Sequence, residues 1–160
     1  MKASIDAGVG KNVILRKYKD PHLYSSVIKH FLRELPDPLL CSSLVKDWKS
    51  VDQTKDELEK QIGIKALLEK VPKANMNNIS FVIGFLAKLE NEKKFNKMTI
   101  ENIIVVLSPN LLWDSYVIHI PISSVYKSML KNYEVIFNAT ELDYYEIDDI
   151  VTEKLKQGLS

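Results

Sequence analysis

The segment from Lys29 to Leu40, with the sequence KHFLRELPDPLL, constrains this chain more than any other. Lys29 and Arg33 are four residues apart, so on a helix they project side by side from one face. Pro36 and Pro38 cannot continue a helix, and each also pushes the residue before it out of the α region. The segment therefore predicts a helix that presents a pair of positive charges and ends beside two prolines.

The apolar residues around this segment define another side of the same helix. They recur at helical spacing and comprise Leu23, Val27, Ile28, Phe31, Leu32 and Leu35. At about 100° per residue, this stripe lies roughly opposite Lys29 and Arg33. We expect the stripe to pack in a core while the cations face outward. Asp20-Pro21 can start the helix, because Asp favours the N-cap and Pro the first helical position.

A second segment points to a known family. Residues 102–113 read NIIVVLSPNLLW, which resembles the N-x-x-x-V-x-x-P-N-L-L-W box of RhoGAP domains, the GTPase-activating modules for Rho-family small GTPases. Residues 29–40 resemble the signature helix of the same family, and the spacing of the two boxes fits. The resemblance covers about residues 1–138. Residues 20–22 and 96–99 look most like the subgroup whose RhoGAP domain follows a membrane-curving BAR domain.

The resemblance implies a surface that binds a GTP-bound Rho-family small GTPase. It implies that Lys29 touches the GTPase near its switch regions and that Arg33 holds the loop carrying the family's catalytic arginine. It gives Asn110 a supporting role in that region and matches Pro121 to a proline of the GTPase-facing surface. On an arbitrary helix, Lys29 and Arg33 would be read as a solvated face, and it is the prolines and the second box that favour a binding surface here. Asn110 could simply turn the chain after Pro109.

One part of the family pattern is missing from this sequence. RhoGAP domains carry an arginine finger in a G-[IL]-[FY]-R-x-x-G-like string, and an arginine inserted in trans accelerates hydrolysis by about 10³–10⁵. The chain has only two arginines, Arg16 and Arg33, and neither lies in such a string. Residues 1–4 resemble the helix just beyond the finger loop. We therefore expect the finger and the first helix of the domain to be absent from this chain.

These features predict a regulator of another enzyme rather than an enzyme. The expected function is a RhoGAP domain that promotes hydrolysis by its GTPase and is impaired without the finger. The alternative is a finger-less RhoGAP-like docking module that binds a GTPase or another protein without stimulating hydrolysis. The sequence holds no P-loop, no nucleophile elbow and no metal-binding spacing of His and Cys, so we expect no catalysis by the chain itself, no cofactor and no metal.

Composition limits the class of partner and the location. The 160 residues are 46% apolar and 27% charged, which is ordinary for one globular domain. The net charge of +1 argues against nucleic acid as a partner. The single cysteine, Cys41, and the lack of an apolar run of about 18 residues favour a reducing, cytoplasmic location without a membrane span. Membrane association is expected only through domains outside this chain.

The patterns predict an all-α fold, a helical bundle of the RhoGAP type that lacks its first helix. We expect this domain over residues 1–140 and an acidic tail over 141–160, with a last helix near 147–157. The helices expected within the domain cover about residues 1–7, 20–35, 41–49, 52–71, 74–90, 100–107 and 122–138. The helix at 74–90 is apolar almost all round, which predicts an interior position.

Overall fold

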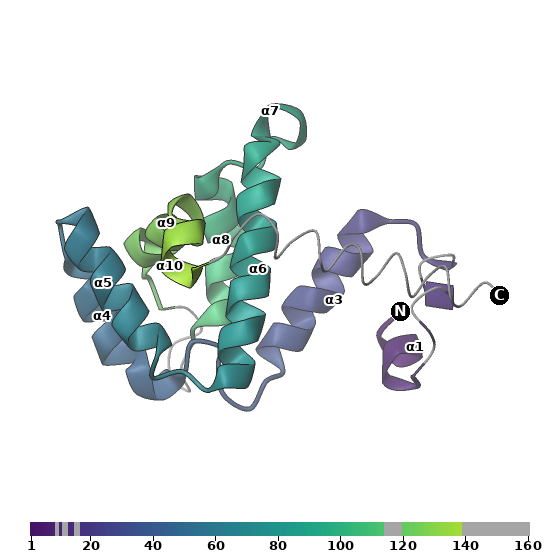
Figure 1. Cartoon of the computed structure of the whole chain (residues 1–160). Coiled ribbons are helices and arrows are strands. Elements are labelled where there is room, and N and C mark those ends of the chain that lie inside the picture. Colours follow the sequence, from purple (N-terminus) through teal and green to yellow (C-terminus); the bar gives the residue numbers. More distant parts are fainter. Residues whose placement is uncertain (9, 11–12, 15–16, 114–119, 139–160) are drawn as a thin grey trace.

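A computed structural model of the chain describes residues 1–8, 10, 13–14, 17–113 and 120–138. These residues form helices and no strand, which confirms the predicted all-α class (Figure 1). The helices are α1 (Lys2–Asp6), α3 (Pro21–Arg33), η1 (Ser42–Leu44, a short 3-10 helix), α4 (Val45–Gln53), α5 (Glu57–Leu68), α6 (Lys73–Asn91), α7 (Lys93–Asn96), α8 (Ile100–Leu111), α9 (Ser123–Lys131) and α10 (Tyr133–Phe137).

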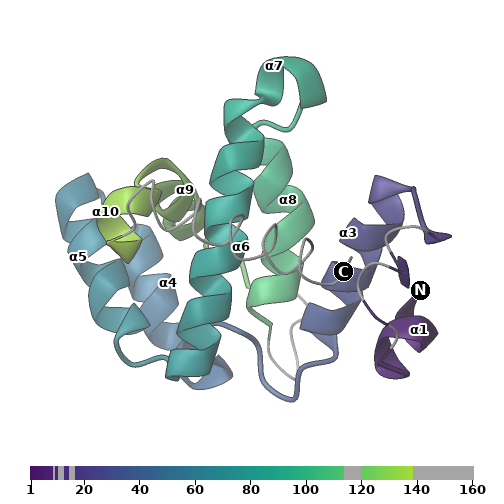
Figure 2. The same cartoon turned by 45° about the vertical axis from the view of Figure 1, so that its right-hand side comes forward.

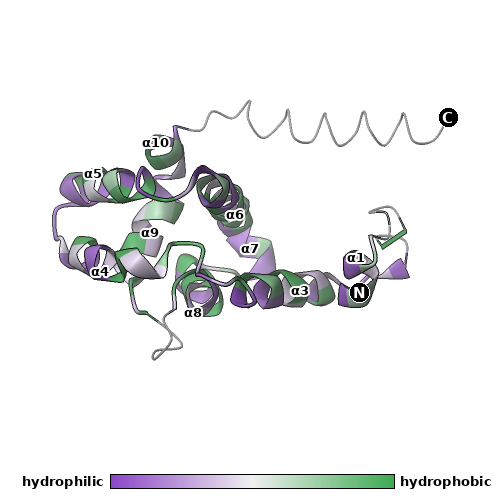
Figure 3. Ribbon diagram, turned by 90° about the horizontal axis from the view of Figure 1, so that it is seen from below, coloured by the Kyte–Doolittle hydropathy of each residue, from purple (hydrophilic) through white to green (hydrophobic). Residues whose placement is uncertain are grey.

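Helix α9 lies at the centre of the bundle and contacts α4, α5, α6, α8 and α10. Its Val125, Tyr126 and Met129 are fully buried or nearly so, and they meet core residues from the surrounding helices. Helix α3 joins this bundle by packing on α8. Seen from below, α3 extends past α8 on the side away from α4 and α5, with α1 beyond it (Figure 3).

Local capping signals placed two helix starts correctly. The Asp20 carboxylate accepts a hydrogen bond from the His22 N–H at 2.9 Å, and Pro21 is the first residue of α3. The Thr99 hydroxyl accepts from the Asn102 N–H at 3.3 Å and begins α8. Each signal works because donor and acceptor lie within three residues of one another.

The helix predicted over 52–71 is wrong at its start. Helix α4 runs on through Asp52 to Gln53, and α5 begins at Glu57 with Asp56 as its N-cap. The Asp52 carboxylate instead accepts a hydrogen bond at 3.0 Å from the backbone N–H of Val125, in the first turn of α9. A capping residue can serve a helix that is distant in sequence, and the local pattern does not show this.

Three other predicted boundaries also need correction. Helix α3 ends at Arg33 rather than Leu35. Helix α8 continues through Pro109 to Leu111, since proline removes only one N–H and the Asn110 amide donates to two carbonyls of the same turn. The helix expected over 122–138 is divided at Asn132, whose side-chain amide donates back to the Ser128 carbonyl at 3.2 Å.

Two apolar surfaces that were expected in the core are exposed. Of the predicted stripe on α3, only Leu32 is buried, whereas Ile28 is 51% and Phe31 61% exposed. On α6, Phe81 is 59% and Phe85 55% exposed, so the helix is buried on one side and not all round. The expected helix near 147–157 lies outside the described residues.

Candidate functional site

Arg33 and Asn110, which are 77 residues apart in sequence, meet where α3 packs against α8. The Arg33 Nε donates a hydrogen bond to the Asn110 Oδ1 at 2.7 Å. Asn110 is fully buried, whereas Arg33 is an exposed residue. One edge of the guanidinium group is therefore held by the protein, and its other N–H donors are left for solvent or a partner.

The orientation of the Asn110 amide follows from its neighbours. Its Nδ2 donates to the carbonyls of Val106 at 2.8 Å and Leu107 at 3.3 Å. The opposite orientation would set the amide NH₂ against the guanidinium group, two donors facing each other. Asn110 therefore joins the last turn of α8 to α3, so its role is more than the simple turn residue that its place after Pro109 also allowed.

The other two predicted site residues, Lys29 and Pro121, take no part in this hydrogen bond. Lys29 is half-buried one helical turn before Arg33, on the same helix. Pro121 is exposed between the buried Ile120 and Ile122. Within the described ranges, no hydrogen bond or ion pair connects Lys29 or Pro121 to the Arg33–Asn110 pair. The structure thus brings two of the four predicted site residues into direct contact.

The two cations of this surface, Lys29 and Arg33, have no acidic ion-pair partner within the part of the chain that the structure describes. Arg33 is instead paired with a neutral amide, which positions the guanidinium group and leaves its charge intact. The surface can therefore attract an anionic partner.

Backbone contacts hold the segment after α3 in place. The Leu40 N–H donates to the Leu111 carbonyl at 3.1 Å, one residue beyond Asn110. The buried Trp48 indole donates to the Leu40 carbonyl at 2.8 Å, and the Asn75 amide donates to the Leu39 carbonyl at 3.2 Å. The chain leaving the proline segment is thus bonded to the end of α8 and to α4 and α6, so both sides of the Arg33–Asn110 contact are held together.

The sequence interpretation missed the contacts of Glu34, directly after α3. Its carboxylate accepts from the Lys2 ammonium at 2.8 Å and lies 3.1 Å from the His30 imidazole. The hydrogen bond from Lys2 lowers the pKa of Glu34, and the adjacent His30 acts in the same direction. The contact brings α1 beside α3 (Figure 2). The pairing of His30 with Glu34 could have been predicted from their spacing of four residues on a helix, whereas the pairing with Lys2 depends on the fold.

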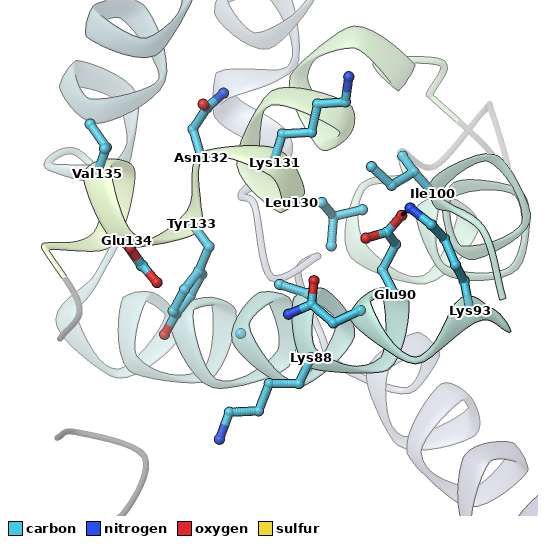
Figure 4. Close-up of a pocket in the computed structure, with 13 residues that line it drawn as sticks. Lys88, Glu90, Lys93, Ile100, Leu130, Lys131, Asn132, Tyr133, Glu134 and Val135 are labelled. Atoms are coloured by element: carbon cyan, nitrogen blue, oxygen red, sulfur yellow. Dashed lines mark hydrogen bonds and ion pairs between the residues drawn. The ribbon is translucent and has the colours of Figure 1, made fainter. Parts of the chain in front are cut away.

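A separate open hollow of about 530 Å³ lies between the C-terminal half of α6 and the turn from α9 to α10 (Figure 4). Its charged lining mixes Lys88, Lys93 and Lys131 with Glu90 and Glu134, and Lys93 pairs with Glu90 at 2.6 Å. The described residues contain no group of three or more His, Cys, Asp and Glu side chains arranged to hold a metal ion. In the same part of the chain, no helix combines the length and apolarity that crossing a bilayer requires.

The bundle and the Arg33–Asn110 contact define an all-helical domain whose polar site is an open surface at the ends of two helices. Comparison with known proteins identifies the family to which this domain belongs. The RhoGAP domain family matches residues 1–116, and this chain belongs to that family. Its relatives are Rho GTPase-activating proteins, so the general function of the family is GTPase activation.

The relatives and solved structures agree with this assignment. Rho GTPase-activating protein 92B of Drosophila melanogaster is 39% identical over 113 residues, which cover 71% of this chain and 15% of that protein. Human Rho GTPase-activating protein 44 is 40% identical over 114 residues, or 71% of this chain and 14% of that protein. The chain thus spans about 15% of the length of these curated relatives. The resemblance to the BAR-containing subgroup fits them.

Two crystal structures share the fold. The BH domain of GRAF, the GTPase regulator associated with focal adhesion kinase, is similar with a TM-score of 0.64 and 27% identity, over 72% of this chain and 65% of that one. Human Rho GTPase activating protein 15 is similar with a TM-score of 0.68 and 26% identity, over 74% of this chain and 59% of that one. Both likenesses support the RhoGAP architecture of the bundle.

Proposed function

We propose that this chain binds a GTP-bound Rho-family small GTPase through the surface formed by Lys29, Arg33, Asn110 and Pro121. The observation that carries the proposal is the hydrogen bond of 2.7 Å between Arg33 and Asn110. It fixes a cation where α3 meets α8, one turn from Lys29 on the same helix. A fixed cation with a second one a helical turn away, neither of them in an ion pair within the described residues, favours association with a partner whose facing surface is acidic or carries phosphate.

We further propose that the chain accelerates hydrolysis only weakly. Stabilising the charge of the transferring phosphoryl group needs an arginine that reaches the nucleotide. The finger string is not among these 160 residues, and Arg33 does not replace it, because its Nε is bonded to Asn110 and its backbone belongs to a helix. The chain would then act as a regulator in the cytoplasm and perform no catalysis, with no nucleic acid as partner.

A single-turnover hydrolysis assay tests the activity. A panel of GTP-loaded Rho-family GTPases is mixed with excess chain, and the rate of phosphate release is compared with the intrinsic rate. We expect an acceleration far below the roughly 10³–10⁵-fold that an arginine inserted in trans provides. An acceleration within that range would refute the proposed impairment.

A binding measurement tests the surface independently of the rate. Affinity for a GTPase loaded with a non-hydrolysable GTP analogue is measured by calorimetry for Lys29→Ala and for Lys46→Ala, an exposed lysine on α4 that serves as the matched control. We expect Lys29→Ala to weaken binding and Lys46→Ala to leave it unchanged, with both circular dichroism spectra intact. Equal affinities of both variants would contradict the assigned surface.

The missing finger string also favours a second candidate, a docking module that binds a GTPase or another protein without affecting hydrolysis. The hydrolysis rate of the bound GTPase distinguishes the weak activator from the docking module. A chain that binds the GTP-bound partner and leaves its rate at the intrinsic value is a docking module. A rate that rises by even a small factor, and falls again with Lys29→Ala, identifies a weak activator.

A further inference from the structure

Helix α6 leaves two phenylalanines uncovered on the side away from the core. Phe81 and Phe85 are one helical turn apart and more than half exposed. Lys88, three residues after Phe85, continues the same face toward the C-terminal end of the helix. Single exposed apolar residues are common on protein surfaces, whereas two neighbouring aromatic rings on one helix form a contiguous apolar patch that another element can cover.

The C-terminal end of the described bundle lies next to this face. The Tyr133 hydroxyl of α10 and the Ser80 hydroxyl of α6 are 3.2 Å apart, and Ser80 directly precedes Phe81. Figure 4 shows Tyr133 reaching from α10 to α6. Helix α10 ends at Phe137, and Asn138 has a left-handed φ of 50° that ends the helix. The start of α10 therefore lies about 100° around α6 from Phe81 and about 140° from Phe85.

The sequence that follows has the pattern of an acidic amphipathic helix. In the C-terminal segment (residues 139–160), Tyr144, Ile147, Val151 and Leu155 recur at the spacing of one helix face. The segment carries six carboxylates and two lysines, a formal charge of −4. Since the whole chain has a charge of +1, residues 1–138 carry +5. The segment and the bundle thus have opposite charges.

We propose that residues 144–155 dock as a helix on the exposed face of α6. The stripe of Tyr144, Ile147, Val151 and Leu155 would cover Phe81 and Phe85, and the flanking carboxylates would lie near Lys88. A helix of twelve residues is about 18 Å long, shorter than the roughly 28 Å of the nineteen residues of α6. The five residues from 139 to 143 can span up to about 18 Å when extended, enough to pass around one helix.

Cysteine crosslinking in the full chain tests this docking. The paired variant Phe85→Cys/Val151→Cys is treated with a mild oxidant, beside the control pair Leu58→Cys/Val151→Cys. Leu58 is 66% exposed on α5, which also contacts α10, so both positions are within reach of the segment. The native Cys41 is buried, and variants that carry only one of the introduced cysteines detect any disulfide that involves it. We expect an intrachain disulfide in the Phe85 pair alone.

The other crosslinking results overturn the proposal. A disulfide-linked dimer through the Phe85 pair would show that a second copy of the chain covers the face. Equal intrachain crosslinking of both pairs would show unspecific contact, and no crosslinking of the Phe85 pair would show that the face is uncovered.

Hydrogen exchange gives a readout that does not depend on the introduced cysteines. Exchange of the α6 amides is compared between the unsubstituted chain, the variant Ile147→Ser/Val151→Ser and the control Gln157→Ser, which changes a polar residue off the stripe. We expect faster exchange over α6 in the double variant only. Identical α6 exchange in all three chains would overturn the proposal.

Discussion

Asn110 uses every hydrogen-bonding group of its side chain for internal contacts. Its oxygen accepts from Arg33, and its amide nitrogen donates to the carbonyls of Val106 and Leu107. The residue is therefore part of the framework of the proposed GTPase-binding surface, whether or not it also touches the partner. A loss of GTPase binding in an Asn110 variant has to be compared with its loss of stability before it is assigned to a contact.

We expect Asn110→Ala to lower the free energy of unfolding by about 1–3 kcal/mol, because the substitution removes the three hydrogen bonds of a fully buried side chain. Urea unfolding followed by far-ultraviolet circular dichroism measures the change. Asn77→Ala, an exposed residue of α6, is the matched control and should stay within about 0.5 kcal/mol of the original chain. Equal stabilities of the two variants would contradict the role assigned to Asn110.

The placement of Lys29 and Arg33 on one helix face was predictable, because helical spacing and the two prolines fix it locally. The Arg33–Asn110 hydrogen bond was not, because it depends on how α3 packs on α8. The family resemblance named both residues as parts of one surface without giving their direct contact. The contact of Leu40 with Leu111 had no sequence signal at all, since it joins two backbone groups.

At the scale of the elements, the sequence predicted a helix start where the capping residue directly precedes the helix. It did not predict the start where the capping residue is distant in sequence. Asp20 caps the helix that directly follows it, as predicted, and Thr99 caps α8 in the same local way. Asp52 stands at the start of the helix expected over 52–71, yet its carboxylate caps the N-terminus of α9 through Val125, 73 residues away. The N-cap residue of α9 itself, Ile122, has no side-chain acceptor, so Asp52 supplies what the local sequence lacks.

We expect Asp52→Ala to destabilise the bundle by about 0.5–2 kcal/mol, the range found for lost N-caps. Asp52→Asn retains an acceptor oxygen and should keep most of that stability. Parallel urea titrations of the two variants separate the hydrogen bond from the charge. A loss as large for Asn as for Ala would show that the charge, rather than the acceptor, stabilises α9.

Gly63 lies in the middle of α5 at a close approach to α4. A Cβ atom placed there would lie 3.0 Å from the Val51 Cγ2 and 3.3 Å from the Val51 Cγ1, which is tighter than ordinary contact. The helix tolerates the roughly 1 kcal/mol that glycine costs relative to alanine because the missing side chain lets the two helices pack. From the sequence alone, a glycine inside a helix indicates only this loss of helix propensity, because the contact with Val51 depends on how α4 and α5 pack.

We expect Gly63→Ala to give less than its propensity gain, because the new methyl group displaces the branched Val51 side chain. In a Val51→Ala background the same change should stabilise the chain by up to about 1 kcal/mol. A double-mutant cycle in urea measures this coupling. Additive effects of the two substitutions would show that Gly63 is not needed for the packing.

At the scale of the whole molecule, hydrophobic periodicity predicted apolar faces correctly but not which faces are covered. The stripe on α3 and the rings on α6 are where the pattern places them, and Ile28, Phe31, Phe81 and Phe85 are nevertheless more than half exposed. A sequence pattern shows that a face is apolar, whereas burial depends on whether a second element packs against it. The interior position predicted for α6 is wrong for this reason.

The exposed stripe on α3 leads us to expect self-association and modest stability. Ile28 and Phe31 lie within one turn of each other, and such contiguous apolar surface favours contact with another copy. Light scattering at increasing concentration should give a mass above that of a monomer, with a melting temperature no higher than about 45–65 °C. Ile28→Ser/Phe31→Ser should lower the mass toward that of a monomer, whereas Phe95→Ser, 84% exposed on α7, should not. A monomer at all concentrations that melts far above this range would contradict the expectation, because the exposed stripe would then neither cause self-association nor lower the stability.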